Sequence, residues 1–253
     1  MPQTECLRVE NLVVRYSDEL ILDDISFSVN RGEIFIIMGG SGSGKSTLLR
    51  HMVGLEMPAS GHVYIRGTNI SSTDEQTFIN LLKKIGVLFQ GSALIGSMSV
   101  GENVALPIIE HLKIDSRLIP QIVRMKLSMV GLACFEQYLP SEISGGMKKR
   151  AGLARAMALN PEILFLDEPS AGLDPGTAAG IDELILHINR TLGTTIVIVT
   201  HDLDSIFTVG NRAIMLDINS KKIIAQGDPR TLRDSHDNPI VSNFFMRKSI
   251  HDS

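Results

Sequence analysis

Short apolar runs recur along the chain, each bounded by turn-forming or polar residues. Continuous runs of this kind are typical of strands buried in a parallel sheet. Other stretches alternate apolar and polar residues, as strands with one exposed face do. The sequence therefore predicts buried strands at 34–38, 85–89, 163–166 and 196–199, and an antiparallel layer from strands at 7–16, 25–29 and 62–67.

A helical repeat separates two of the buried strands. Its apolar positions have the spacing of one helix face and indicate an amphipathic crossover helix; they are Ile181, Leu184, Ile185, Ile188 and Leu192. Alternation of strand, helix and strand predicts an α/β fold with a parallel sheet. Two short runs at 213–216 and 223–226 indicate a terminal hairpin, whereas residues 91–143 are helix-compatible, for example at 119–130.

Composition changes this picture little. The chain has 253 residues, of which 43% are hydrophobic and 21% charged, as in ordinary globular proteins. A formal net charge of −4 gives no sign of nucleic-acid binding. The two cysteines, Cys6 and Cys134, are far apart and are predicted to be free thiols. Because neither a secretory signal nor a membrane-length apolar run is evident, we expect a soluble cytosolic protein.

A glycine-rich loop connects the buried strand at 34–38 to a predicted helix at 46–53. Its glycines allow main-chain amides to curl around a polyphosphate, where a Cβ would intrude. Lys45 would reach the β- and γ-phosphates, and the Ser46 hydroxyl would hold Mg²⁺. A flexible linker fits less well, because apolar segments lie close on both sides. The residues of this predicted Walker A loop are Gly39, Gly40, Ser41, Gly42, Ser43, Gly44, Lys45, Ser46 and Thr47.

Two acidic residues, Asp167 and Glu168, follow the buried strand at 163–166. Ligands of parallel sheets gather at the carboxyl ends of the strands. There, Asp167 could support the Mg²⁺ shell, and Glu168 could orient and deprotonate a water that attacks the γ-phosphate. The alternative is an ordinary pair of surface acids.

Polar residues also follow two neighbouring buried strands. His201 comes directly after the strand at 196–199 and is a candidate for contacting the γ-phosphate. Gln90 ends the run at 85–89 and could bind Mg²⁺ or the attacking water, although it could equally be an ordinary loop glutamine.

The triplet Ser144-Gly145-Gly146 opens a helix rich in alanine and leucine. A helix that begins in this way can bind a second anion through its free main-chain amides. Taken alone, the triplet is equally consistent with a plain helix cap.

Together these motifs resemble the ATP-binding cassette (ABC) ATPase family, in family order and over nearly the whole chain. The resemblance implies a P-loop ABC fold, with a RecA-like parallel core, an antiparallel β layer and a helical insertion. In the resemblance, residues 39–46 are the Walker A motif, Gln90 is the Q-loop residue and Ser144–Gly146 are the signature. Residues 163–167 are the Walker B motif, Glu168 is the catalytic glutamate and Ser170–Asp174 are the D-loop. His201 is the switch residue, and Tyr16 is the aromatic residue that stacks on adenine.

One departure narrows the resemblance, because Met147 stands where many members carry Gln. The ATPases of lipid transporters that work with MCE-domain proteins often carry Ser-Gly-Gly-Met, and the chain resembles them in this motif. The segments 91–94, 98–104 and 238–245 also resemble that subgroup. The implied function is to energise phospholipid transport. Alternatives are an ABC subunit for another solute, a soluble ABC protein acting on nucleic acid or ribosomes, and a non-hydrolysing nucleotide sensor.

The resemblance also implies an assembly. Two copies would close head to tail around ATP, with Ser144–Gly146 of one copy completing the site of the other, and Asp174 of the D-loop is a further expected nucleotide-binding residue. Mg²⁺ would lie on Ser46, Gln90 and Asp167. The expected partners are a separate multi-span permease and an MCE-domain protein, without nucleic acid, at the cytoplasmic face of the inner membrane.

The expected organisation is a single ABC ATPase domain over residues 1–253. Within it we expect a nucleotide-binding core at 1–90 plus 144–234, a helical subdomain at 91–143 and a C-terminal tail at 235–253. The aromatic pair Phe244-Phe245 in that tail either docks onto the partner subunit or packs onto its own domain.

Overall fold

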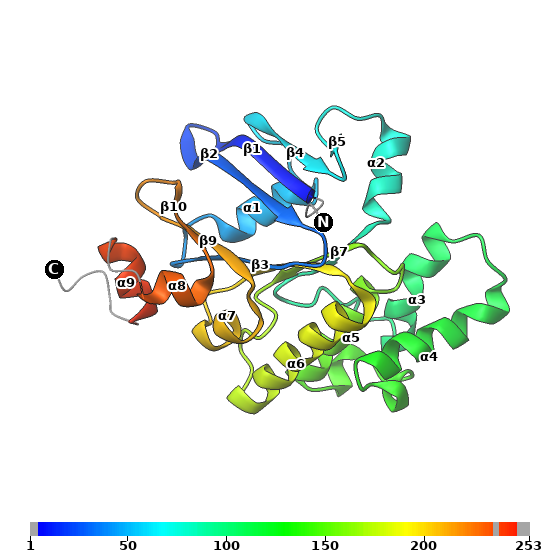
Figure 1. Ribbon diagram of the computed structural model, residues 1–253. Helices are drawn as coiled ribbons and strands as arrows, with labels where there is room; N and C mark the ends of the chain where they lie inside the picture. Colours follow the sequence, from blue (N-terminus) through cyan, green and yellow to red (C-terminus); the bar gives the residue numbers. More distant parts are fainter. Residues whose placement is uncertain (1–4, 235–237, 247–253) are drawn as a thin grey trace. The chain divides into compact units, whose positions relative to one another are not determined.

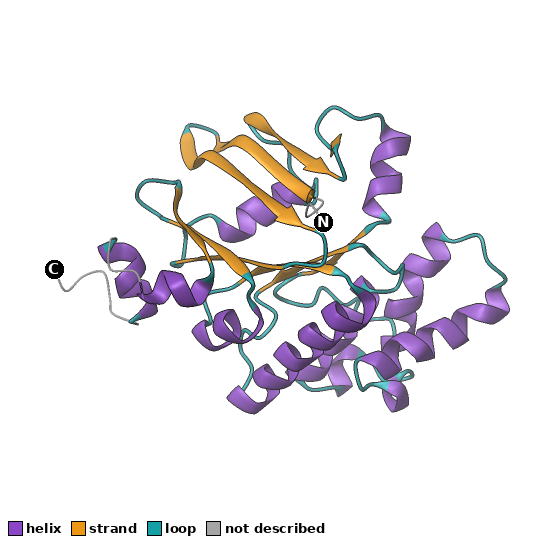
Figure 2. Cartoon of the chain, viewed as in Figure 1, coloured by secondary structure: helices purple, strands orange, loops and turns teal. Residues whose placement is uncertain are grey.

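The computed structural model describes residues 5–234 and 238–246 (Figures 1 and 2). The chain divides into two compact units, one formed by Met1–Phe78 with Thr195–Ser253 and the other by Ile79–Thr194. Helix α2 (Glu75–Leu82) spans the change from the first unit to the second along the chain. The two units are described separately below.

The first unit contains the antiparallel layer that the alternating sequence predicts. Its strands lie in the order β2 (Glu19–Asn30), β1 (Glu5–Tyr16), β4 (Ser60–Ile65) and β5 (Thr68–Asn69) (Figure 2). Each neighbouring pair runs antiparallel. One face of β1 supplies apolar side chains to the core, and these are Leu7, Val9, Leu12 and Val14.

A second group of strands in the first unit carries the predicted buried runs. The fully buried strand β3 (Ile34–Gly39) pairs in parallel with β8 (Thr195–Val199) and with β9 (Arg212–Leu216). Strand β10 (Ile223–Gly227) runs antiparallel to β9, which confirms the terminal hairpin. The helices of this unit are α1 (Lys45–Met52), α7 (Leu203–Val209), α8 (Pro229–Asp234) and α9 (Pro239–Phe245) (Figure 1).

Helix α9 contains the aromatic pair of the predicted tail. The Phe245 ring stacks on Phe207 of α7, with ring centroids 5.6 Å apart, and Phe245 is buried. This contact favours packing onto the chain's own domain over docking onto a second subunit. The remainder of the tail, at 235–237 and 247–253, lies outside the described residues.

The second unit combines two parallel strands with most of the long helices. Strand β6 (Ile85–Leu88) pairs in parallel with β7 (Ile163–Asp167), as their apolar runs predict. The crossover repeat forms α6 (Pro175–Leu192), and the helix-compatible stretch forms α4 (Ile119–Met129). Helices α3 (Val100–His111), α4 and α5 (Gly145–Ala156) pack together. The boundaries of a separate helical subdomain at 91–143 stay a prediction.

Two expectations about the chain as a whole can be compared with the described residues. Cys6 and Cys134 are free thiols, as predicted, and burial raises the pKa of the Cys6 thiol. Within 5–234 and 238–246, every helix falls short of the length and apolar character needed to cross a bilayer.

Candidate nucleotide site

The glycine-rich loop after β3 adopts a conformation that requires glycine at specific positions. Gly39 has φ 149°, and Gly44 has φ 89° where it begins helix α1. A Cβ on Gly39 would lie 2.5 Å from the carbonyl oxygen of Leu216, and one on Gly44 would lie 2.8 Å from Leu22 Cδ2. The loop therefore keeps its path only while these positions lack side chains.

Lys45 folds back over this loop. Its Nζ donates to the carbonyl oxygens of Gly39 at 3.0 Å and Gly40 at 2.8 Å, and its side chain is buried. The ammonium thus lies beside the main chain that the sequence predicts to surround phosphate groups. Lysine acts as a point charge in such loops, so this placement suits a polyanion.

Two further features of the loop fit a bound triphosphate. The Ser43 hydroxyl is buried and has no hydrogen-bond partner. A phosphate oxygen could accept its hydrogen bond and remove the cost of burying an unpaired hydroxyl. Gly44 gives the start of α1 no side-chain cap, which leaves a place for an anion at the positive end of the helix. Ser46 and Thr47, in the first turn of α1, are partly exposed.

His201 belongs to the same unit as the loop. Ile37 of β3 lies opposite Val199 of β8, and the Thr200 amide donates to the Ile37 carbonyl at 3.2 Å. The exposed His201 therefore follows the carboxyl end of the strand next to β3. The first unit brings the predicted Walker A loop and the predicted switch histidine to the same edge of its parallel strands.

Tyr16, the predicted adenine-stacking residue, ends strand β1. Tyr16 is 43% exposed, and its hydroxyl donates to the Glu56 carboxylate. Partial burial is the larger cause, and this hydrogen bond the next, of a raised pKa of the Tyr16 hydroxyl. An accessible ring face is compatible with stacking on a base, but that role stays a prediction.

The second unit holds the two acidic residues at the end of β7. Asp167 and Glu168 are both buried, and Glu168 adopts φ 48°, which is rare for a residue with a side chain. Backbone conformations of this kind often occur where a catalytic group must be held in one orientation.

Lys149, which sequence reasoning did not single out, lies between the Q-loop residue and the predicted catalytic glutamate. Its Nζ donates to the main-chain carbonyl of Gln90 at 2.5 Å and to that of Glu168 at 2.9 Å. Burial lowers the pKa of the Lys149 ammonium, and the carboxylates of Glu168 and Asp167 offset part of this effect. The second unit therefore joins Gln90, Asp167 and Glu168 around one buried cation.

The predicted signature residues lie at the start of α5. The Ser144 hydroxyl accepts from the Met147 amide at 3.3 Å and caps the helix. A Cβ on Gly146 would lie 2.4 Å from Thr177 Cγ2, so the start of α5 approaches α6 closely. Asp174 caps α6 by accepting from the Thr177 amide at 3.0 Å, and hydrogen bonds from Thr177 lower the pKa of Asp174. Signature and D-loop residues thus lie together in the second unit.

Asn103 is a second residue that sequence reasoning missed. It is fully buried, and its side-chain oxygen accepts from the Ile95 amide at 2.8 Å. Its Nδ2 donates to the carbonyls of Ile95, Met98 and Ser99. Asn103 therefore fixes the loop that leads from the Q-loop into α3. A lone asparagine among apolar helix positions is the signal that could have revealed it.

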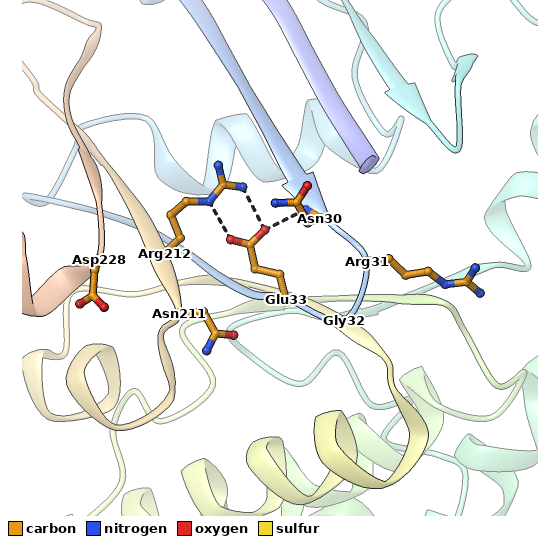
Figure 3. A pocket seen from close by; sticks show the side chains of 7 residues that line it. All are labelled: Asn30, Arg31, Gly32, Glu33, Asn211, Arg212 and Asp228. Carbon is orange, nitrogen blue, oxygen red and sulfur yellow. Dashed lines mark hydrogen bonds and ion pairs between the residues drawn. The ribbon is translucent and has the colours of Figure 1, made fainter. Parts of the chain in front are cut away.

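A polar cavity of about 520 Å³ lies in the first unit, at the amino-terminal ends of β3 and β9 (Figure 3). Arg212 and Glu33 point toward one another there, with Nε–Oε1 at 2.7 Å and Nη2–Oε2 at 2.9 Å. Arg212 also donates to the Ser28 carbonyl at 2.6 Å and stacks over the Phe35 ring. This pair holds β9 to the turn before β3, and none of the predicted site residues lines the cavity.

The ABC transporter family profile matches residues 22–171, which run from β2 through the predicted Walker motifs into the predicted D-loop. The chain belongs to the ABC transporter family. It is an ATPase of that family, as its ordered motifs predict.

Curated relatives cover almost the full length of this ABC ATPase. It is 39% identical over 235 residues to the intermembrane phospholipid transport system ATP-binding protein MlaF of Haemophilus influenzae, covering 93% of this chain and 88% of that protein. The MlaF of Escherichia coli K12 is 41% identical over 225 residues, 89% of this chain and 82% of that protein. A probable ribonucleotide transport ATP-binding protein, mkl of Mycobacterium leprae, is 38% identical over 250 residues, covering 99% of this chain and 71% of that protein.

Solved structures confirm the ABC fold. A dimeric bacterial ABC transporter cassette, MJ0796, aligns with a TM-score of 0.81 and 32% identity, over 88% of this chain and 98% of that chain. CbiO1 from Clostridium perfringens, part of the cbiONQ transporter complex, aligns with a TM-score of 0.82 and 31% identity, over 91% of each chain. The α/β P-loop fold expected from the sequence is therefore confirmed, whereas the roles of individual residues stay predictions.

Proposed function

We propose that this ABC ATPase energises a membrane transporter that moves phospholipid. The observation that carries the proposal is the similarity to two MlaF proteins, which are named for intermembrane phospholipid transport, at 39% and 41% identity. Met147, directly after the signature glycines, supports the same assignment because it departs from the common Gln.

A second candidate is an ATPase for another solute, and one comparison favours it. The mkl relative, at 38% identity, is named for ribonucleotide transport. Because the ATPase subunit of a transporter does not contact the cargo, the chemistry of its nucleotide site is the same in both cases. Identification of the cargo requires the assembled complex.

The Walker A loop supplies the groups that bind the triphosphate. Lys45 and the loop amides neutralise and orient the phosphate oxygens, and the Ser43 hydroxyl provides a further donor. Ser46, Gln90 and Asp167 would hold Mg²⁺, which when bound withdraws charge from the phosphates. The aromatic ring of Tyr16 would stack on the adenine base.

Glu168 acts as the general base in this proposal. Its carboxylate accepts a proton from water while the water oxygen attacks the γ-phosphorus. The bond between that phosphorus and the β–γ bridging oxygen breaks, and ADP leaves with the electron pair. His201 contacts the γ-phosphate and senses whether it is still attached.

Two copies of the chain form the working enzyme. Residues Ser144–Gly146 and Asp174 of each copy complete the nucleotide site of the other in a two-fold symmetric dimer. The dimeric structures of the related cassette MJ0796, one of them bound to ADP and Pi, support this arrangement. Hydrolysis removes the charge that bridges the copies, and the population shifts toward the open dimer.

The closing motion is delivered to a separate permease. The second unit has a cavity of about 210 Å³ between α3 and α4, lined by residues that include Ala105, Val123 and Glu136. In the family that the chain resembles, a groove between Gln90 and the helical insertion receives a permease segment, and this cavity lies within that insertion. An MCE-domain protein would complete the complex, with the ATPase peripheral at the cytoplasmic face of the inner membrane.

The substitution Glu168→Gln tests the proposed chemistry. Removing the base should lower kcat by about 10²–10⁴-fold, while nucleotide binding is retained and the ATP-bound dimer accumulates. Phosphate release, ATP affinity and size-exclusion chromatography measure the three effects. Glu183→Gln, which alters an exposed glutamate on α6 of the same unit, is the matched control. Wild-type turnover in the Glu168→Gln protein would remove Glu168 from the role of base.

A further inference from the structure

Lys149 occupies an unusual position for a lysine. It lies in the second turn of α5, five residues after the capping Ser144, and its side chain is buried. Lys148, its neighbour on the same helix, is partly exposed. Burial of an ammonium is costly unless charged or hydrogen-bonding groups surround it. The groups around Lys149 therefore show how the buried ammonium is stabilised and which segments it connects.

Those groups come from two loops that are distant in sequence. The carbonyl of Gln90 is 59 positions away and that of Glu168 is 19 positions away, and both accept from the same Nζ. Hydrogen bonds from an ammonium are shorter and stronger than those between neutral groups. The Lys149 amine therefore ties the main chain at the end of β6 to the main chain at the end of β7.

The bond to Glu168 falls where it controls the direction of a side chain. Glu168 has φ 48°, and its carbonyl also accepts from the Ala171 amide at 3.2 Å, which closes the turn after β7. A change in the backbone at Glu168 would redirect its carboxylate, because the carbonyl group and the side chain are attached to the same Cα. The carboxylates of Glu168 and Asp167 attract the Lys149 ammonium and help to keep it in place.

We propose that Lys149 is a positioning residue that locks Gln90 and Glu168 into one geometry, so that movement of the Q-loop changes the aim of the catalytic carboxylate. This inference rests on the proposed role of Glu168 as the base. Lys149 itself does not contact the reacting atoms. It acts through the carbonyls that it holds.

The substitution Lys149→Met tests this role in the full chain within its transporter complex. Methionine keeps the length of the side chain and removes the donor. Because a small misplacement of a catalytic group is costly, kcat for ATP hydrolysis should fall by about 10²-fold. The KM for ATP and the ATP affinity should change little, since the Walker A loop is untouched. Lys149→Arg, which keeps a cation and donors, should recover part of the loss.

Two controls separate positioning from folding. Lys148→Met removes the neighbouring lysine, and its turnover should remain within about 2-fold of wild type, as for most surface changes. Thermal unfolding of each variant shows whether the protein is folded. If Lys149→Met does not fold, Lys149→Gln is measured in its place. Its uncharged amide is one bond shorter than the lysine side chain and donates more weakly, so kcat should still fall, by less than the loss expected for Lys149→Met.

The double variant Lys149→Met/Glu168→Gln supplies the readout that a general structural role would not move. If Lys149 acts through Glu168, the double variant turns over ATP at the rate of Glu168→Gln alone. A further loss in the double variant, or a folded Lys149→Met with wild-type kcat, would overturn the inference. Failure of the proposed function is distinguishable, because it would appear first as full activity in Glu168→Gln alone.

Discussion

Two buried lysines, Lys45 and Lys149, use the same chemistry at different sequence distances. Each ammonium donates to two main-chain carbonyls. The partners of Lys45 are six and five residues away, so its role follows from a local motif. The partners of Lys149 are 59 and 19 residues away and are backbone atoms, which no side-chain pattern reports. Its one sequence signal is a lysine at helical spacing between the buried residues Gly146 and Leu153.

A third buried lysine, Lys126 of α4, gives a pH-dependent prediction. Its Nζ donates to Asn160 Oδ1 at 2.5 Å, and burial lowers the pKa of the ammonium below its ordinary value of 10.5. As pH rises toward 10.5, the unfolded chain keeps this proton longer than the folded protein does. The lysine therefore makes the free energy of unfolding increase with pH in that range.

Lys126→Met removes this dependence. The free energy of unfolding of wild type minus that of the variant should become more positive from neutral pH to just below 10.5. Urea unfolding of both proteins at a series of pH values measures the difference. A difference that stays constant over the series would contradict the assignment of a depressed Lys126 pKa.

At the scale of elements, burial decides what the sequence could predict. Strands β3 and β8 are buried along their whole length, and their apolar runs located them to within one residue. Helix α2 (Glu75–Leu82) has no buried residue and is only eight residues long, and the sequence did not predict it. The short helices α7, α8 and α9 were missed because six or seven residues are too few to establish a helical period.

The contact between β6 and α5 gives a prediction at this scale. A Cβ on Gly86 would lie 2.2 Å from the Ala156 carbonyl oxygen, which is main chain and cannot rotate away. Gly86→Ala should therefore lower the free energy of unfolding by about 1–3 kcal/mol through overpacking. Gly96→Ala is the matched control, since a Cβ there would meet nothing within 4 Å. Equal stability of the two variants in urea unfolding would show that β6 and α5 do not approach so closely.

At the scale of the whole molecule, the order of the motifs along the chain carried most of the prediction. That order identified the ABC transporter family, which the profile match over residues 22–171 confirms. The structure adds that the predicted site residues form two groups, Gly39–Thr47 with His201 in one unit and Gln90 with Asp167 and Glu168 in the other. Neither group of residues identifies the cargo, because a transported molecule does not contact the ATPase.

The proposed cargo and partners can be measured together. Tagged Glu168→Gln protein is purified from detergent-solubilised membranes of its native cell with ATP and Mg²⁺, which should trap the closed complex. Mass spectrometry then identifies the co-purifying proteins and bound lipids, against the same preparation without nucleotide. We predict a multi-span permease, an MCE-domain protein and enriched phospholipid. A permease with a solute-binding protein and no enriched lipid would contradict phospholipid transport and favour another solute.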